Sequence, residues 1–184
     1  MYENPQQRTA LVVPVFEAVS SIQPFRAEHI PTAAVAIPPH VTIRSHFVPF
    51  EDIDGRLDNE LVAFFGSRPR FRFTLERMGR FLEADVLYLD PEPEEPFQAL
   101  MRSLNRTFPQ APPDPHPNRK MHVTIARCGV EGMDEMENRF LRECGSSLPI
   151  EAVAREVWLY EKLDGAWHKR KRFHLSEGID TEGQ

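Results

Sequence analysis

The chain has 184 residues, of which 22 are basic and 28 acidic, so its formal net charge is −6. This length is enough to bury one sizeable core without disulfides, and the charge excludes the uniformly basic surface that binds long nucleic acids, although a local basic pocket for a small anion or a strand end remains compatible with it. Its two cysteines, Cys128 and Cys144, form neither a disulfide framework nor the closely spaced pairs of a zinc site.

The N-terminal segment and the apolar runs indicate the compartment. MYENPQQRTA has no charged-then-apolar signal pattern, the apolar runs are too short to span a bilayer, and so few cysteines are typical of a reducing environment. We therefore expect a cytoplasmic protein that binds no membrane. The sequence leaves the oligomeric state open, and a monomer is favoured.

The first half of the chain predicts three strands and two helices. Residues 11–16 (LVVPVF) indicate a buried strand whose proline favours an edge or a bulge, and residues 18–30 are weakly helical. Residues 40–48 form an extended segment that two prolines precede. A helix begins at Asp52 and ends at Gly66, because apolar residues recur there at helical spacing, and residues 71–78 alternate as a strand does.

The second half repeats this order. A strand is predicted over 83–90, and DPEPEEPF opens a helix that extends to Phe108, with its acidic residues in the first turn where the helix dipole favours them. A proline-rich loop leads to a strand over 122–128 and a helix over 131–144.

Two further segments, 150–160 and 166–175, are predicted strands. The element order is then β-α-β-α-β twice, followed by one strand, which predicts an α+β fold. We expect a single domain over 1–184 with two pseudo-twofold-related lobes, approximately 1–80 and 81–175. Mostly antiparallel sheets should flank a central cleft.

The tetrapeptide HVTI occurs in both halves, at residues 40–43 and 122–125. Because side chains alternate along a strand, the histidine and threonine of each copy share one face, roughly 7 Å apart, while valine and isoleucine share the other. Two such strands around a twofold axis would place two histidines and two threonines around one concave site.

This set of groups suits the transfer of protons around a phosphate. Histidine titrates near neutral pH, so a neutral ring can take a proton from an attacking hydroxyl or water and a charged ring can give one to the leaving oxygen, each worth about 10²–10⁴ in rate. Threonine hydroxyls can donate to non-bridging oxygens. The pattern therefore predicts a phosphodiesterase that needs no metal and no cofactor.

Paired HxTx segments, one in each half of a duplicated β-α chain, resemble the 2H phosphoesterase superfamily, and within it the 2′-5′ RNA ligase family of bacterial proteins. LVVPVF, IPPHVTIRSHFVPF, FRFTLERMGRF, MHVTIAR and VWLYEKLDGAWH follow one another as they do in such proteins.

The resemblance implies activity on 2′,3′-cyclic phosphates or 2′-5′ phosphodiester bonds of RNA ends or nucleotides, with 2′-5′ ligation as the reverse reaction. It implies His40 and His122 as the acid/base pair and Thr42 and Thr124 as ligands of phosphate oxygens.

The resemblance also implies a basic residue just past each motif, and Arg44 and Arg127 occupy these places. Strict alternation puts Arg44 on the face of His40 but puts Arg127 on the face opposite His122. Arg127 could reach the site only through a bulge or because the strand ends there.

Two other functions remain open. A binding module would hold a cyclic or 2′-5′-linked nucleotide in the same pocket without turnover. A metal-dependent hydrolase would use His40, His46, His116 and His122, but it normally adds Asp or Glu at close spacing, and none accompanies either motif. Plain structural roles are favoured for His46, as a half-exposed strand residue, and for His116, in an exposed loop.

Overall fold

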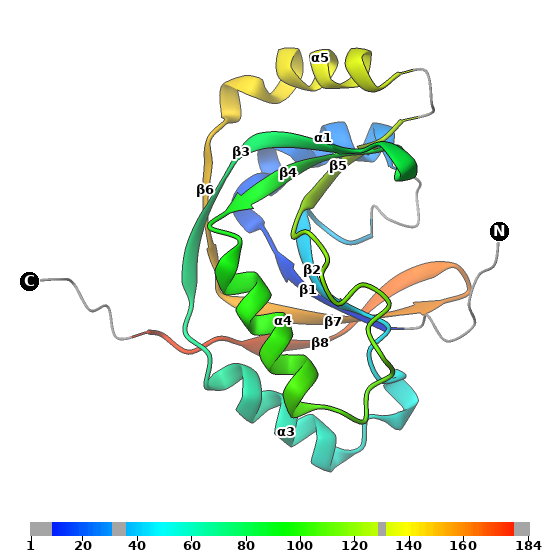
Figure 1. The fold of residues 1–184 in the computed structure, drawn as a ribbon, viewed down its shortest axis with the longest axis vertical. Coiled ribbons are helices and arrows are strands. Elements are labelled where there is room, and N and C mark those ends of the chain that lie inside the picture. The colour runs from blue at the N-terminus through cyan, green and yellow to red at the C-terminus, as the bar shows by residue number, and fades with distance from the viewer. Residues whose placement is uncertain (1–8, 31–35, 129–131, 179–184) are drawn as a thin grey trace, which may run out of the picture.

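The computed structural model describes residues 9–30, 36–128 and 132–178 and has the predicted α+β architecture (Figure 1). Two four-stranded sheets form it, and every strand pair in them is antiparallel. In order across the first sheet lie β2 (His40–Ser45), β1 (Thr9–Pro14), β7 (Glu156–Leu163) and β8 (Ala166–His174). In order across the second lie β5 (Val123–Arg127), β4 (Val86–Glu92), β3 (Phe71–Phe81) and β6 (Ile150–Ala154).

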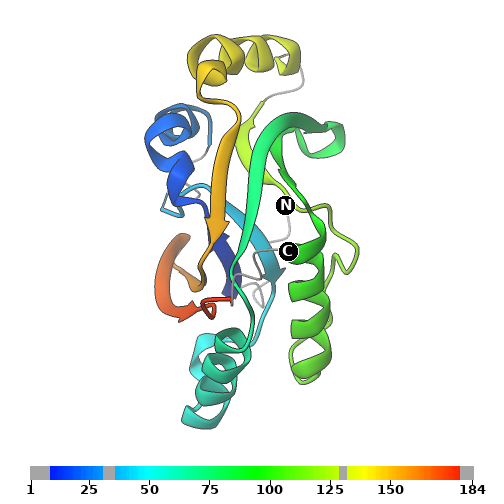
Figure 2. The same cartoon turned by 90° about the vertical axis from the view of Figure 1, so that its left-hand side faces the viewer.

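The strand pairing differs from the sequence prediction at two places. The predicted strand over 150–160 is two strands, because the chain leaves the second sheet after Ala154 and enters the first at Glu156. The sheets also do not divide the chain near residue 80: β3 pairs with β4 and β6, and β7 pairs with β1. Figure 2 shows β3 as a long strand that runs between the two ends of the molecule. This strand ends the first half of the sequence but belongs to the second sheet.

Four helices cover these sheets in the described part of the chain: α1 (Val19–His29), α3 (Gly55–Gly66), α4 (Glu95–Thr107) and α5 (Met133–Cys144). Residue 131, where the last helix was expected to begin, lies outside the described residues. Asp54 caps α3 by accepting a hydrogen bond from the Leu57 N–H at 2.8 Å, which satisfies one of the free donors at the helix start. Each helix buries an apolar stripe, and one continuous core cluster draws on both sheets.

Two helices cross between the sheets in a way that positions the HVTI strands. Helix α1, which follows β1 of the first sheet, packs on β5 of the second, and α4, which follows β4 of the second sheet, packs on β2 of the first (Figure 1). Strands β2 and β5 are the edges of their sheets and contact each other. The fold therefore brings the two copies of HVTI to one place.

None of the helices that the structure describes is long and apolar enough to cross a membrane.

Candidate active site

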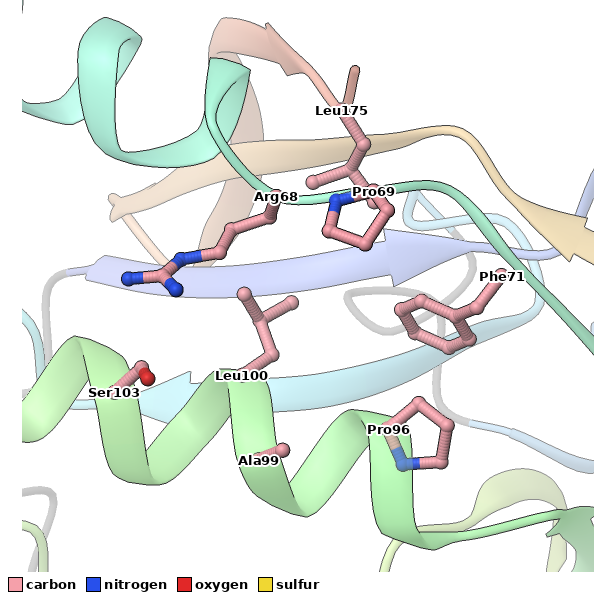
Figure 3. Close-up of a pocket in the computed structure, with 8 residues that line it drawn as sticks. All are labelled: Arg68, Pro69, Phe71, Pro96, Ala99, Leu100, Ser103 and Leu175. Atoms are coloured by element: carbon pink, nitrogen blue, oxygen red, sulfur yellow. The ribbon is translucent and has the colours of Figure 1, made fainter. Parts of the chain in front are cut away.

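Two hollows in the described surface differ in chemistry. One, of about 370 Å³, lies between α4, the start of β3 and the segment after β8, and its walls are mostly apolar (Figure 3). Arg68 lines this hollow, but its guanidinium packs over the ring of Phe64, 4.6 Å from the ring centre. This hollow offers no group for acid/base work.

The second hollow lies between β2 and β5 and has a volume of about 350 Å³. It contains both histidines and both threonines of the HVTI segments. Its described lining is Thr9, Ala10, Val12, Arg26, Ile30, Ile37, His40, Thr42, Ser45, His116, Arg119, His122, Thr124, Arg127 and Trp167. Three arginines and three histidines line this cavity, and no carboxylate does among the described residues, so it forms a local basic pocket in an acidic protein.

The two motif histidines are held in the same way. His40 Nδ1 lies 2.7 Å from the Pro38 carbonyl oxygen, and His122 Nδ1 lies 2.8 Å from that of Lys120. A carbonyl only accepts hydrogen bonds, so Nδ1 carries the proton in each neutral ring and Nε2 is left as the acceptor. Both rings are thus set in the tautomer that a general base requires.

The segments that precede each histidine are themselves fixed. The Pro39 carbonyl accepts a hydrogen bond from the Val15 N–H at 2.7 Å, which ties the first motif to β1. Before the second motif, Lys120 pairs with Asp90 at 2.9 Å, and the Met121 N–H donates to Glu94 at 2.7 Å.

Burial makes both histidines weak bases. Burial, with the nearby charge of Arg26 as the second cause, lowers the pKa of His40 to about 3. Burial also lowers the pKa of His122, and the charges of Arg119 and Arg127 add to this. The charge on His122 further lowers the pKa of His40, so the two rings influence each other across the cavity.

The two threonines lie as alternation predicts. Thr42 and Thr124 line the cavity, and neither hydroxyl forms a hydrogen bond with another described residue. Valine and isoleucine of each motif are fully buried on the opposite face. Both hydroxyls are therefore free to donate to a bound anion.

A bulge in each motif strand changes the alternation after the threonine. On β2, Leu11 faces Arg44 and Val12 faces Thr42, so Ile43 is the extra residue. On β5 the same irregularity occurs at Ile125, between the partners of Leu87 and Tyr88.

The bulge on β2 corrects the prediction for Arg44. This arginine does not line the cavity: it is 3% exposed, and its guanidinium donates to the Asn105 side chain and the Pro112 carbonyl. Because Ile43 and Arg44 both turn inward, the next residue, Ser45, returns to the cavity face.

The bulge on β5 has the opposite result for Arg127. Without it, alternation would turn Arg127 away from His122. The extra residue brings Arg127 back, and it lines the cavity. Arg127 and Ser45 thus occupy matching positions, five residues after their histidines.

Aromatic rings fix the orientation of His122. The ring of Phe81 meets the imidazole edge-to-face at 4.9 Å between centroids, and Tyr88 approaches it at 5.5 Å. Phe81 and Tyr88 also stack on each other at 4.2 Å. Together with the Lys120 carbonyl, these rings leave His122 little rotational freedom.

Sequence reasoning missed Arg26, which is 2% exposed and lines the cavity from α1. Its Nε donates to the Thr124 carbonyl at 2.9 Å, and it pairs with no carboxylate among the described residues. Burial lowers its pKa to about 10. One signal could have found it: Arg26 shares the buried face of α1 with Ile22 and Phe25, where a charge is unexpected.

The structure also assigns places to the less favoured histidines. His116 is exposed, as expected, but it lines the cavity. His46 is partly buried outside the cavity, and its Nδ1 lacks a partner among the described residues. Within the described ranges, no three His, Cys, Asp or Glu side chains are grouped so as to hold a metal ion.

Comparison with known proteins places the chain in a family. The profile of the 2′-5′ RNA ligase superfamily matches residues 14–166. Comparison with curated protein sequences finds no significant match.

Solved structures share the fold. E. coli LigT complexed with NADP⁺ is 20% identical with a TM-score of 0.62, over 93% of this chain and 98% of that one. LigT complexed with 3′-AMP is 19% identical with a TM-score of 0.61, over 93% and 99% of the two chains. TT0787 of Thermus thermophilus is 16% identical with a TM-score of 0.53, over 92% and 98%.

The superfamily profile spans most of the sequence, and the fold matches these structures over nearly the whole chain. This protein therefore belongs to the 2′-5′ RNA ligase superfamily of 2H phosphoesterases, as the paired HVTI segments predict.

Proposed function

We propose that the protein is a metal-independent phosphodiesterase that cleaves 2′,3′-cyclic phosphates or 2′-5′ phosphodiester bonds of RNA ends or nucleotides. The observation that carries this proposal is the common cavity of His40 and His122, each with Nδ1 tied to a backbone carbonyl. Ligation to a 2′-5′ bond is the same chemistry in reverse.

In the proposed hydrolysis, the neutral His40 takes a proton from water through Nε2 as the water oxygen attacks phosphorus. The bond from phosphorus to the leaving oxygen breaks in line, and protonated His122 gives that oxygen its proton. Thr42, Thr124 and Arg127 bind the non-bridging oxygens.

The surroundings of the two rings favour this division of roles. His40 is the more strongly depressed, with a pKa of about 3, so it is neutral in the free protein and suited to act as the base. Burial and the charges of Arg119 and Arg127 also lower the pKa of His122, but a bound phosphate anion would raise that pKa and keep the ring protonated.

The apolar side of the cavity suits the nucleoside part of the substrate. Ile37, Val12 and the half-buried ring of Trp167 line it beside the histidines. LigT, which shares the fold, has been crystallised with 3′-AMP, ATP and NADP⁺. A nucleotide is therefore the ligand that we propose for this cavity.

Hydrolysis of the four nucleoside 2′,3′-cyclic phosphates in EDTA tests the proposal. We expect turnover that EDTA does not reduce, and the position of the phosphate in the product identifies the leaving oxygen. Turnover that EDTA abolishes and a divalent ion restores would contradict the proposal. Tight nucleotide binding without product over hours would replace it with the binding module.

The pH dependence of kcat/KM tests the assignment of acid and base. The acid must be protonated in the free enzyme, and the pKa of His122 is held below its ordinary value of 6.5. We therefore expect kcat/KM to fall as pH rises, with the midpoint of that fall below pH 6.5. The fall in kcat should lie at higher pH, because the bound phosphate raises the pKa of His122. A kcat/KM that keeps rising through neutral pH would contradict this assignment.

A further inference from the structure

The pseudo-twofold arrangement of the cavity is incomplete at one position. Each histidine and each threonine has its counterpart across the site, but Arg127 on β5 is matched by Ser45 on β2. A hydroxyl on β2 thus stands where β5 has a guanidinium. The strand that carries His40 therefore supplies no cation at this position of the cavity.

A guanidinium from another segment fills this place. Arg119 lines the cavity from the loop that leads into β5, and its Nη2 donates to the Ser45 hydroxyl at 2.9 Å. Its side chain is only 11% exposed, and its charge contributes to the lowered pKa of His122. Arg119 therefore lies between the end of the first motif and the start of the second.

The loop holds Arg119 in a fixed turn. The buried carboxylate of Asp114 accepts hydrogen bonds from Arg119 Nη2 at 2.7 Å and from the His116 N–H at 2.9 Å. The Arg119 N–H in turn donates to the His116 carbonyl at 3.1 Å. Such a turn, with its side chain placed in advance, binds a ligand at little entropic cost.

The charges of this cluster do not cancel. Asp114 also lies 3.9 Å from the Nε of Arg44, which is buried beside it. One carboxylate thus faces two guanidinium groups, so an excess positive charge remains next to the cavity. Of the two arginines, Arg119 is the one that reaches the cavity, whereas Asp114 is not part of the described lining.

We propose that Arg119 binds the phosphate of the substrate from the His40 side of the cavity, as the counterpart of Arg127 on the His122 side. Arg119 takes the role that the family resemblance implied for Arg44, and Ser45 and Asp114 orient it. This inference rests on the proposed function for its substrate, but the anion site itself does not depend on turnover.

The test measures the Kd of inorganic phosphate by calorimetry and kcat and KM for a nucleoside 2′,3′-cyclic phosphate. Arg119→Met is expected to raise both Kd and KM about tenfold or more, since a hydrogen bond between charged groups is lost. Arg119→Lys, which keeps the charge and can still pair with Asp114, is expected to recover most of the phosphate affinity. Arg142→Met, an equal change of charge on the exposed face of α5, serves as the matched control.

Two results with the variants would overturn the inference. One is a phosphate Kd and KM in Arg119→Met equal to those of the control. The other is an Arg119→Lys variant as weak as Arg119→Met, which would indicate that only the shape of the loop matters. A wild-type protein that binds phosphate but cleaves no nucleotide would count against the proposed function alone, and the phosphate Kd of the variants would still decide the role of Arg119. A wild-type protein that binds no phosphate would also overturn it.

Discussion

Replacement of His40 or His122 by alanine is expected to lower kcat for 2′,3′-cyclic phosphate hydrolysis by about 10²–10⁴-fold, because each substitution removes one proton transfer in the transition state. The two rings act as a unit, so the double variant should be little slower than the worse single variant. KM should change less than kcat, because Thr42, Thr124 and Arg127 still line the cavity.

The control for this pair is His168→Ala, an exposed histidine on β8 outside the described lining of the cavity. Its kcat should equal that of the unmodified protein. Variants of His40 and His122 that keep more than about a tenth of the original kcat would contradict acid/base catalysis by these rings.

An activated substrate separates the two roles. A p-nitrophenyl phosphodiester releases a stable anion, so its leaving oxygen needs no proton. The loss in His122→Ala should then shrink markedly, whereas the loss in His40→Ala should persist, because water still requires a base. Equal losses on both substrates would contradict the assignment of His122 as the acid.

The repeated HVTI segments made the centre of the site predictable. Their alternation and the equal element order around them predicted two histidines and two threonines around one concave site, and these four residues line one cavity. That both motif strands are the edges of their sheets is a finding of the structure. The family, too, follows from these segments and is confirmed by the superfamily profile.

The bulges at Ile43 and Ile125 account for most of what alternation could not predict. One extra residue reverses the face of everything after it, so Arg44 turns into the protein and Arg127 turns into the cavity. No residue type marks either bulge, since isoleucine is an ordinary strand residue.

Long-range contacts explain the remaining differences. Arg26 and Arg119 reach the cavity from a helix and a loop, and their places depend on how these segments pack against β5 and β2. The residues over 150–160 have the pattern of one unbroken strand, and only their pairing with two different sheets divides them into β6 and β7.

Gly79 lies outside the described lining of the cavity but is connected to His122 through Tyr88. On β3 it lies directly opposite Tyr88 of β4, and Tyr88 lies opposite Thr124 of β5. A Cβ added to Gly79 would overlap the ring and hydroxyl of Tyr88. Since Tyr88 also contacts the imidazole of His122, any shift of that ring displaces the proposed general acid.

We therefore expect Gly79→Ala to lower kcat by about 10²-fold, the cost of misplacing a reacting group by roughly 1 Å. Overpacking should also lower the free energy of unfolding by about 1–3 kcal/mol, measured by urea denaturation. The control is Gly55→Ala at the start of α3, where an added Cβ meets nothing within 4 Å, and it should leave kcat unchanged.

A second substitution tells the clash from other effects of the added methyl group. Tyr88→Leu removes the overlapping ring atoms, so the double variant with Gly79→Ala should lose less stability than the sum of the two single variants. Its kcat should stay low, because the ring that supports His122 is gone. Full additivity in stability, or a normal kcat in Gly79→Ala, would show that Tyr88 does not transmit the position of Gly79 to His122.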